Sequence, residues 1–314
     1  MPEPPHNWGR WGDGDQLGTL NLLTPERVLA ALGAARTGRV LGLALPIKGA
    51  TSGTAPAGVP HMAGRPLPQH FMSIDGGDYA AGTRAIGAGL RTADDALVLS
   101  PHGTTTHMDA LCHMWTGDTL YNGHPADRVR SYGAGRLGIE HAAGRGVIAR
   151  GVLFDAARHR GVERLDARDR VGAEELAEMA AAAGADAPRA GDAVLLRTGW
   201  PLAWAEDPAR YQGAQPGLGA DAGRWLAERD VALVAADNTA VQGLNAGGRS
   251  DEDLRDDLHL TLLWRHGIHL AEMLWLEELA AALAAEDRSD FLFIALPLPV
   301  HGGTASPVNP VAVL

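Results

Sequence analysis

The sequence predicts an α/β protein, and two observations lead to this fold class. Short apolar runs bounded by Gly, Asp or Pro, typical of strands, alternate along the chain with segments of helical spacing and composition. We find no internal repeat and no linker in the 314 residues, a length between one large domain and two ordinary ones. We therefore expect one domain over residues 1–314, with an N-terminal arm over about residues 1–24.

The first expected elements follow this arm. Thr24 suits the N-cap position, Pro25 suits the first helical position, and an apolar stripe follows, so we expect a helix from Pro25 to Ala35. The apolar run Val40–Ile47 predicts a short strand. The stretch from Gly49 to Gly77 is rich in Gly, Pro and His, which indicates a long loop.

The remaining segments supply the alternation of strands and helices. Runs of strand character are Ala96–Leu99, Gly146–Phe154, Ala193–Arg197, Val231–Ala236 and Phe291–Leu296. Segments of helical character are Glu174–Ala183, Ala220–Arg229 and Leu276–Ala285. Their irregular spacing argues against a regular doubly wound sheet or a regular barrel.

Composition and charge exclude several classes of protein. The hydrophobic fraction of 46% and the charged fraction of 21% are those of a folded globular chain. A net charge of -11 opposes a large surface for phosphate backbones, so we expect no nucleic-acid partner. No apolar stretch approaches the roughly 18 residues that span a bilayer, and the first residues do not resemble a signal peptide. We expect no membrane partner and a cytoplasmic location.

The single cysteine, Cys112, limits the chemistry of any metal site. One thiol excludes an intrachain disulfide and a site built from several thiolates. Any metal ion therefore depends on nitrogen and oxygen ligands, for which the chain offers 13 histidines.

A dense cluster of such ligands lies in the middle of the chain. Within twelve residues stand His102, His107, Asp109 and His113, a combination that zinc, manganese or iron accepts. In extended backbone His107 and Asp109 share one face, whereas His113 reaches the same centre only across a turn or a helix start. A single isolated histidine is usually an ordinary polar residue, but four ligands together favour a metal site.

This cluster carries a family resemblance. The segment from Thr106 to His113 resembles the signature His-x-Gly-Thr-His-x-Asp-Ala-Pro-x-His of the cyclase/kynurenine formamidase-like metal hydrolases, which include isatin hydrolases. The likeness extends through residues 8–12, 18–24, 191–200 and 302–310. It implies a mixed sheet or barrel-like β core flanked by helices.

The resemblance also implies roles for individual residues. His107 and Asp109 match metal ligands of the family, and His113 matches its catalytic histidine. His259 and Glu272, far downstream, match a distant ligand pair. We therefore expect Glu272 among the metal ligands, and we place His259 with His113 in the candidate catalytic set.

Two departures from the family signature affect this assignment. The family's first histidine falls at Gly103, so ligation by His102, one residue earlier, needs a bulge in the backbone. The motif proline is replaced by Leu111, which can alter the turn that carries His113. We retain His102 as a candidate ligand and leave open whether one ion or two bind.

The family likeness implies a metal-dependent hydrolase acting on the amide, lactam or lactone carbonyl of a small, often aromatic or cyclic molecule. It implies Zn²⁺ or Mn²⁺ as the cofactor, His113 as general base and acid, and a homo-oligomeric state, either dimer or tetramer. Candidate substrate-binding residues are Trp115, Trp8, Trp11 and His61.

Several other functions compete with this hypothesis. Kynurenine formamidase itself is one alternative, and a non-catalytic binding protein stabilised by a metal ion is another. A thiol hydrolase using Cys112 is disfavoured because the adjacent His113 points away from it in most backbone conformations. The glycine pattern Gly133–Gly138 is no evidence for dinucleotide binding, because it is expected by chance and follows no apolar strand.

Overall fold

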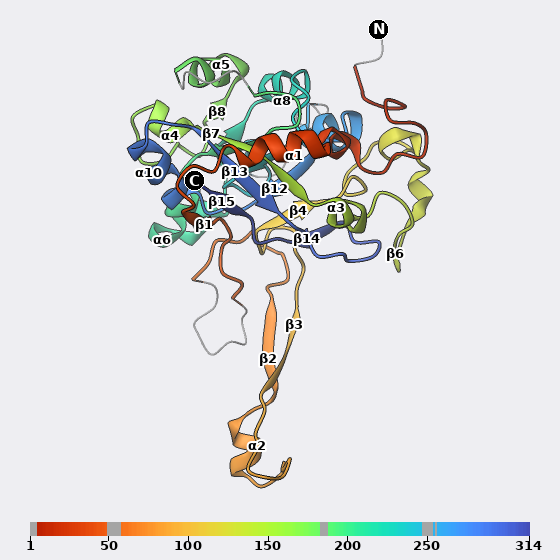
Figure 1. The fold of residues 1–314 in the computed structure, drawn as a ribbon, viewed down its shortest axis with the longest axis vertical. Coiled ribbons are helices and arrows are strands. Elements are labelled where there is room, and N and C mark those ends of the chain that lie inside the picture. The colour runs from red at the N-terminus through yellow and green to blue at the C-terminus, as the bar shows by residue number, and fades with distance from the viewer. Residues whose placement is uncertain (1–4, 49–57, 183–187, 247–253, 255) are drawn as a thin grey trace.

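A computed structural model describes residues 5–48, 58–182, 188–246, 254 and 256–314 (Figure 1). Its largest element is a nine-stranded mixed sheet with the order β1-β15-β13-β7-β9-β11-β12-β4-β14. The pairs β7–β9, β9–β11 and β11–β12 are parallel, and the other neighbours are antiparallel. The strands are β1 Val40–Gly42, β4 His107–Asp109, β7 Val147–Asp155, β9 Ala193–Arg197, β11 Leu233–Ala236, β12 His269–Glu272, β13 Asp290–Ala295, β14 Ala305–Pro307 and β15 Val311–Val313.

Helices surround this sheet. In Figure 1 α1 crosses in front of the sheet, α5 and α8 lie at the top and α10 lies at the left edge. The helices are α1 Pro25–Leu32, α3 Ile139–Arg145, α4 Ala156–His159, α5 Ala173–Ala182, α6 Ala203–Glu206, α7 Pro208–Tyr211, α8 Ala220–Ala227 and α10 Glu277–Ala285. A π-helix covers Leu260–Arg265, and 3₁₀ turns cover Gly18–Leu22, Tyr121–Gly123, Ala126–Arg128 and Trp200–Leu202. Among the described residues, no helix combines the length and apolar character needed to cross a bilayer.

The centre of the sheet is buried on both faces. Every residue of β9, β11 and β12 is buried, as is expected of parallel strands covered by helices. This burial explains the continuous apolar runs Ala193–Leu196 and Val231–Ala236, from which strands over Ala193–Arg197 and Val231–Ala236 were predicted. The α/β fold class with a mixed sheet flanked by helices is confirmed.

Two expectations for the N-terminal half were wrong. The strand expected over Val40–Ile47 ends at Gly42, and only an isolated bridge between Ala44 and Leu274 follows. The ladder stops because the next residue of the partner strand, Pro310, has no N–H to continue it. The long loop expected from Gly49 to Gly77 ends in strand β2 and the start of helix α2. Residues 49–57 of that stretch lie outside the described part of the chain.

Strand β2 belongs to a hairpin that extends away from the body. Strands β2 (Gln69–Ile74) and β3 (Asp94–Val98) pair only with each other, and helix α2 (Gly76–Ala80) lies near the tip (Figure 1). We call residues 69–98 the hairpin arm. The other short ladders are β5 (Val129–Arg130) with β6 (Gly133–Ala134), and β8 (Arg170–Val171) with β10 (Gly217–Leu218).

The N-terminal segment contacts the segment before β12 at a point where Gly18 and Gly267 approach each other closely. The backbone N–H of Thr19 donates to the Gly267 carbonyl at 2.9 Å, and Gly18 adopts a φ of +57°. A Cβ at Gly18 would collide with the carbonyl group of Gly267. Because Gly267 lies just before β12, this contact supports the start of that strand.

We predict that Gly18→Ala lowers the free energy of unfolding by at least about 3 kcal/mol, since it combines a left-handed backbone with a backbone clash. Gly14→Ala is the matched control, because Gly14 has open space around its Cα and no left-handed φ. Urea unfolding followed by circular dichroism measures both variants. Equal stability of the two would contradict the proposed contact.

Candidate metal centre

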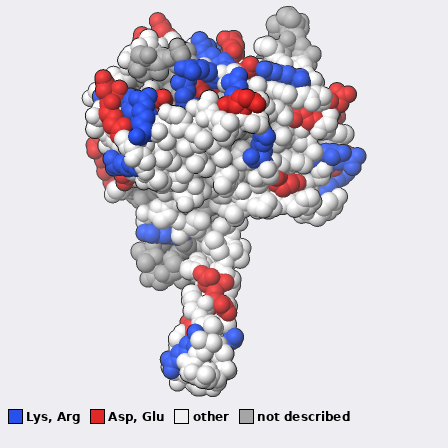
Figure 2. Space-filling view, in the orientation of Figure 1, with Lys and Arg blue, Asp and Glu red and all other residues white. Residues whose placement is uncertain are grey.

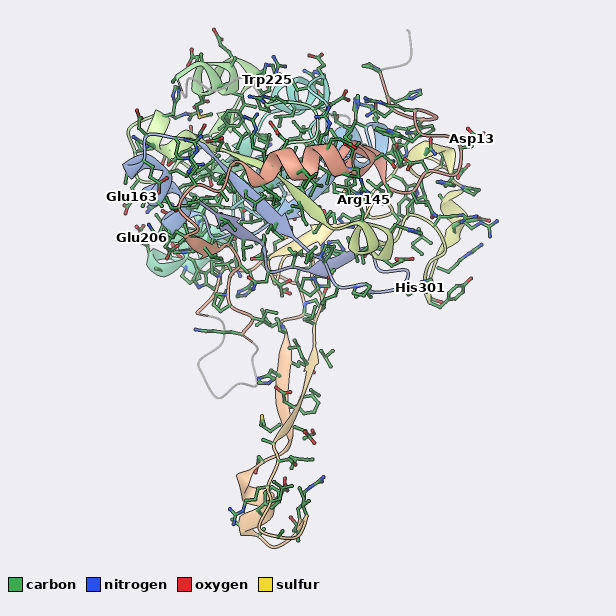
Figure 3. All side chains as sticks on the ribbon, viewed as in Figure 1. Asp13, Arg145, Glu163, Glu206, Trp225 and His301 are labelled. Carbon is green, nitrogen blue, oxygen red and sulfur yellow. The ribbon has the colours of Figure 1, made fainter. Side chains whose placement is uncertain are left out.

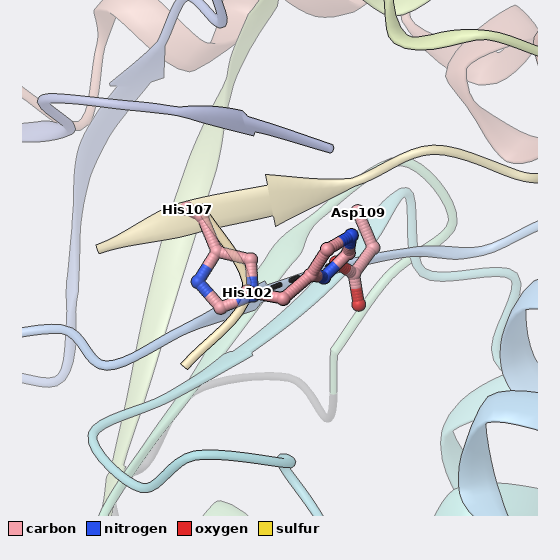
Figure 4. Close-up of side chains that lie close together, drawn as sticks. All are labelled: His102, His107 and Asp109. Atoms are coloured by element: carbon pink, nitrogen blue, oxygen red, sulfur yellow. Dashed lines mark ion pairs between the residues drawn. The ribbon is translucent and has the colours of Figure 1, made fainter. Parts of the chain in front are cut away.

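The centre of the site is strand β4, which lies between β12 and β14. Its antiparallel register with β12 sets Glu272 opposite His107, and their side chains meet with His107 Nε2 3.3 Å from Glu272 Oε2. Asp109 lies two residues along the same strand, on the same face, with Oδ1 3.5 Å from His107 Nε2 (Figure 4). All three side chains are buried. The expected approach of His107 and Asp109 to one point is therefore present.

His102 reaches the same point through a turn. The backbone N–H groups of Thr104 and Thr105 both donate to the Pro101 carbonyl at 3.3 Å, and Gly103 adopts a φ of +73° within this turn. His102 Nδ1 then lies 3.2 Å from Asp109 Oδ1 (Figure 4). The irregular backbone that His102 needs is thus a glycine turn and not a strand bulge.

His259 directly precedes the π-helix and also reaches the two carboxylates. Its Nε2 lies 3.2 Å from Glu272 Oε1 and 3.8 Å from Asp109 Oδ2. Its Nδ1 lies 3.3 Å from Asp257 Oδ1, which also accepts the backbone N–H of His259 at 2.7 Å. Asp257 therefore orients the imidazole, a role that the sequence analysis missed within a run of acidic residues.

His113 joins the group across a turn in which its backbone N–H donates to the Ala110 carbonyl at 3.0 Å. Its ring stacks on that of His102, with centroids 4.0 Å apart and planes 18° apart, and lies 5.8 Å from the ring of His259. Leu111, in place of the motif proline, is compatible with a turn that brings His113 to the cluster.

The donor atoms fit a divalent cation. Buried atoms without a hydrogen-bond partner include His107 Nε2, both carboxylate oxygens of Asp109 and Glu272 Oε1. Buried carboxylates are costly unless a cation or hydrogen-bond donors compensate them. His107 Nδ1 lies 2.8 Å from the Thr105 carbonyl, which fixes the proton there and leaves the Nε2 lone pair directed at the acids, as in metal-ligating histidines.

Ligand atoms of two overlapping groups converge within 4.8 Å: His102, His107 and Asp109 form one, and Asp109, His113 and His259 form the other. Asp109 belongs to both groups, and neither of its carboxylate oxygens accepts a hydrogen bond from the described residues. It is therefore the residue best placed to contact either one ion or two.

The electrostatics keep both acids ionised. Burial acts to raise the pKa of Asp109, but the neighbouring imidazoles, His113 first, outweigh it and hold this pKa below its usual range. Burial and the negative charge of Asp109 both act to raise the pKa of Glu272. The contacts of Glu272 with His107 and His259 outweigh them and leave this pKa lowered. The site thus presents two carboxylates to a cation at neutral pH.

Two histidines of the site, His113 and His259, have pKa values shifted in opposite directions. Burial lowers the pKa of His113 to about 4, so this ring is neutral at pH 7. Burial acts the same way on His259, but Asp257 and Glu272 outweigh it and raise the pKa of His259 to about 10.

A cavity of about 500 Å³ opens over this centre. His102, His113, His259 and Glu272 reach its wall, which also includes Met62, Arg65, Met114, Gln212, Thr239 and Leu244. These additional residues come from separate segments and belong to no motif, so no signal in the sequence could have placed them at one site.

None of the four predicted substrate-binding residues lines this cavity, and their role stays a prediction. Trp8 donates its indole N–H to the Trp264 carbonyl at 2.8 Å, and Trp11 lies beneath the Arg10 guanidinium. The remaining two are Trp115, which lies past His113 and is 36% exposed, and His61, whose ring packs on Trp204 with centroids 4.6 Å apart.

Fold and site together define a mixed α/β protein with a buried imidazole–carboxylate centre beside a cavity. The sequence model of the Cyclase family, described as "Putative cyclase", matches residues 43–242. A crystal structure described as a novel cyclase is 34% identical, with a TM-score of 0.88 over 99% of this chain and 100% of that one. The chain belongs to the Cyclase family, which confirms the resemblance drawn from the sequence.

More distant solved structures share the fold. An isatin hydrolase bound to the product analogue thioisatinate is 19% identical, with a TM-score of 0.63 over 93% of this chain and 99% of that one. An isatin hydrolase A from Ralstonia solanacearum is 20% identical, with a TM-score of 0.56 over 92% and 97%. A "predicted metal-dependent hydrolase" from Bacillus stearothermophilus is 18% identical, with a TM-score of 0.51 over 87% and 97%. No curated protein matches the chain.

We predict that the purified protein binds Mn²⁺ or Zn²⁺ and that Asp109→Ala weakens this binding at least about 100-fold, because both ligand groups lose their shared carboxylate. His301→Ala is the control, since His301 is 94% exposed and its removal leaves the centre intact. Calorimetric titration of the metal-free proteins measures the affinities. Unchanged binding by Asp109→Ala would contradict the site.

Proposed function

We propose that this chain is a metal-dependent hydrolase that cleaves an amide, lactam or lactone bond of a small aromatic or cyclic substrate. One observation carries the proposal. Buried ligand atoms of His107, Asp109 and Glu272 that lack hydrogen-bond partners among the described residues lie together, and Glu272 lines a cavity large enough for a small molecule. A closed structural metal site has no need of such a cavity beside it.

The ion is expected to be Zn²⁺ or Mn²⁺, held by His107, Asp109 and Glu272 with His102 as a further ligand. When bound, it supplies Lewis acidity, which polarises a carbonyl group and acidifies water. His259 lies between Asp257 and Glu272, and we assign it to positioning within the catalytic set.

His113 is the proposed general base and acid. Its ring lines the cavity and is neutral at pH 7, so a ring nitrogen is free to accept a proton from water. The resulting imidazolium, close to the Asp109 carboxylate, then returns the proton to the leaving nitrogen or oxygen. Stacking on His102 holds the ring in place during both transfers.

The cavity wall favours small apolar substrates. Met62, Met114 and Leu244 supply apolar surface, which suits an aromatic or cyclic group. Arg65 is the only Lys or Arg among the described residues lining the cavity, and it forms no ion pair with the described residues. An anionic group on the substrate would complement it.

The thiol mechanism has little support. Cys112 is fully buried, does not line the cavity, and its Sγ donates to the Gly303 carbonyl at 3.8 Å. Burial raises the pKa of this thiol to about 12, so the nucleophilic thiolate is scarce at neutral pH.

We predict that Asp109→Asn and His113→Ala each lower kcat/KM by at least about 100-fold on aryl formamides, isatin or simple lactones, because they remove a ligand and the proton acceptor. Cys112→Ala is the matched control and keeps most of the activity. Chelation abolishes turnover and leaves far-UV circular dichroism unchanged, and added Mn²⁺ or Zn²⁺ restores the rate. Unfolding on chelation without hydrolysis of any substrate would favour a structural ion.

We further predict that Arg65→Met lowers kcat/KM for N-formylanthranilate by about tenfold or more, equivalent to about 1.4 kcal/mol, because the substrate carboxylate loses its cation. Formanilide, which lacks the carboxylate, serves as the matched substrate and changes less than about twofold. Steady-state kinetics on both substrates separates the two effects. Equal losses on both substrates would show that Arg65 does not recognise charge.

A further inference from the structure

One stretch of chain carries two groups of the candidate metal centre, His259 at its start and Glu272 at its end. We call residues 259–272 the His259–Glu272 segment; the π-helix Leu260–Arg265 and strand β12 lie within it. π-Helical turns are rare and are found frequently at functional sites. The last carbonyl groups of a helix have no partner inside the helix, so this segment needs hydrogen-bond donors from elsewhere.

The N-terminal arm supplies these donors. It donates to four successive carbonyl groups at the end of the π-helix, those of Trp264, Arg265, His266 and Gly267. The first accepts the indole N–H of Trp8 at 2.8 Å. The second and third accept the backbone N–H and the side-chain amide of Asn7, each at 2.9 Å, and the fourth accepts the backbone N–H of Thr19 at 2.9 Å. Donors near the start of the chain therefore complete a helix that lies near its other end.

Ring packing and burial add to these hydrogen bonds. The rings of Trp8 and Trp264 meet edge to face, with centroids 5.1 Å apart and planes at 86°. Trp264 in turn donates its indole N–H to the Thr119 carbonyl at 2.8 Å. Trp264 is half-buried and Gly267 is buried, and a buried carbonyl that loses its partner is costly. The arm therefore restrains the end of the π-helix.

The arm is itself fixed to the part of the chain that follows the histidine–aspartate cluster. The side-chain carbonyl of Asn122 accepts the backbone N–H of Gly9 at 2.7 Å. The Tyr121 hydroxyl donates to the Asp15 carboxylate at 3.2 Å. The arm thus connects the two regions of sequence that supply the candidate metal centre.

The outer side of the arm faces solvent. In Figure 1 the arm runs down the right side of the body, and Figure 2 shows charged side chains of both signs on that side. Arg10 pairs with Asp230, and their side chains are 36% and 31% exposed. Asp13 is exposed and lies at the right-hand edge of the molecule (Figure 3). The arm therefore presents charged groups to solvent and hydrogen-bond donors to the π-helix.

We propose that Asn7 and Trp8 are positioning residues of the candidate metal centre. They act through the His259–Glu272 segment, whose two ends supply groups of the site and whose middle they hold. His259 Nε2 and Glu272 Oε1 lie 3.2 Å apart, so a small shift of the segment changes the spacing of the donor atoms around Asp109. This role rests on the metal centre that the proposed function also requires. It needs no contact between Trp8 and a substrate.

The test compares the wild type with the double variant Asn7→Ala/Trp8→Phe in the absence of any substrate. The variant removes two of the four donors and keeps an aromatic ring at position 8. We expect calorimetric titration of the metal-free proteins to show about tenfold weaker Mn²⁺ binding by the variant. At saturating Co²⁺ we expect its visible absorption bands to shift, because these bands report the geometry of the ligands.

Asp13→Ala is the matched control in the same arm. The Asp13 side chain forms no hydrogen bond or ion pair with the residues that the structure describes. This variant is expected to keep the wild-type Mn²⁺ affinity and Co²⁺ spectrum.

Amide hydrogen exchange of the metal-free proteins gives a second, local measurement. We expect the amides of residues 261–268 to exchange at least about tenfold faster in the double variant, while those of β7 and α10 keep their wild-type rates. This pattern separates loosening of the His259–Glu272 segment from a general loss of stability. If circular dichroism shows that the double variant does not fold, Trp8→Phe alone is measured in the same way, with about threefold weaker Mn²⁺ binding expected.

Two results would overturn the proposal: a folded variant with the wild-type Mn²⁺ affinity and Co²⁺ spectrum, or an equal loss of affinity in Asp13→Ala. Both would leave the proposed hydrolase function intact, because the candidate ligands are unchanged. A wild type that binds Mn²⁺ but hydrolyses no substrate would count against the proposed function alone. A wild type that binds no Mn²⁺, Zn²⁺ or Co²⁺ would overturn both.

Discussion

The constraint on which the rest of the structure depends is the burial of two carboxylates, Asp109 and Glu272, on neighbouring strands. Charges of one sign held this close are tolerable only with positive charge between or beside them. Four imidazoles surround the pair, and three of them contact the Thr304 hydroxyl, the Thr105 carbonyl and the Asp257 carboxylate. The sheet order, which sets β4 between β12 and β14, is what brings these groups into one place.

How much of this arrangement could be predicted from the sequence depends on how local each signal is. Strands β9 and β13 were predicted because each is a continuous apolar run. Strands β4 and β12 were not predicted from the sequence. They are only three and four residues long, and polar residues at both ends leave no continuous apolar run. The approach of His107 and Asp109 to one point was predicted because the two residues lie two apart in one segment. Asp257, Met62 and Arg65 are brought to the site only by tertiary packing.

Sequence identity to the solved structures varies widely although the fold is shared, and the placement of the candidate site residues in the fold offers a reason. Identity of 34% to one cyclase structure accompanies nearly complete overlap, whereas the hydrolase structures share the fold at 18–20% identity. The candidate metal ligands come from the sheet and from segments adjoining it, which a shared fold retains. The cavity wall comes from loops, where side chains vary without disturbing the sheet. We therefore expect the loops that line the cavity of this chain to set any substrate preference.

The placement of β14 has a consequence for the order in which the protein is made. All the side chains of the metal centre have been synthesised once residue 272 leaves the ribosome, yet β4 still lacks its neighbour on one side. That neighbour, Ala305–Pro307, and the hydroxyl of Thr304 that holds His102 come more than thirty residues later. A nascent chain would therefore carry every candidate ligand before it could hold them rigidly, and productive capture of a cation would wait until Ala305–Pro307 has joined the sheet.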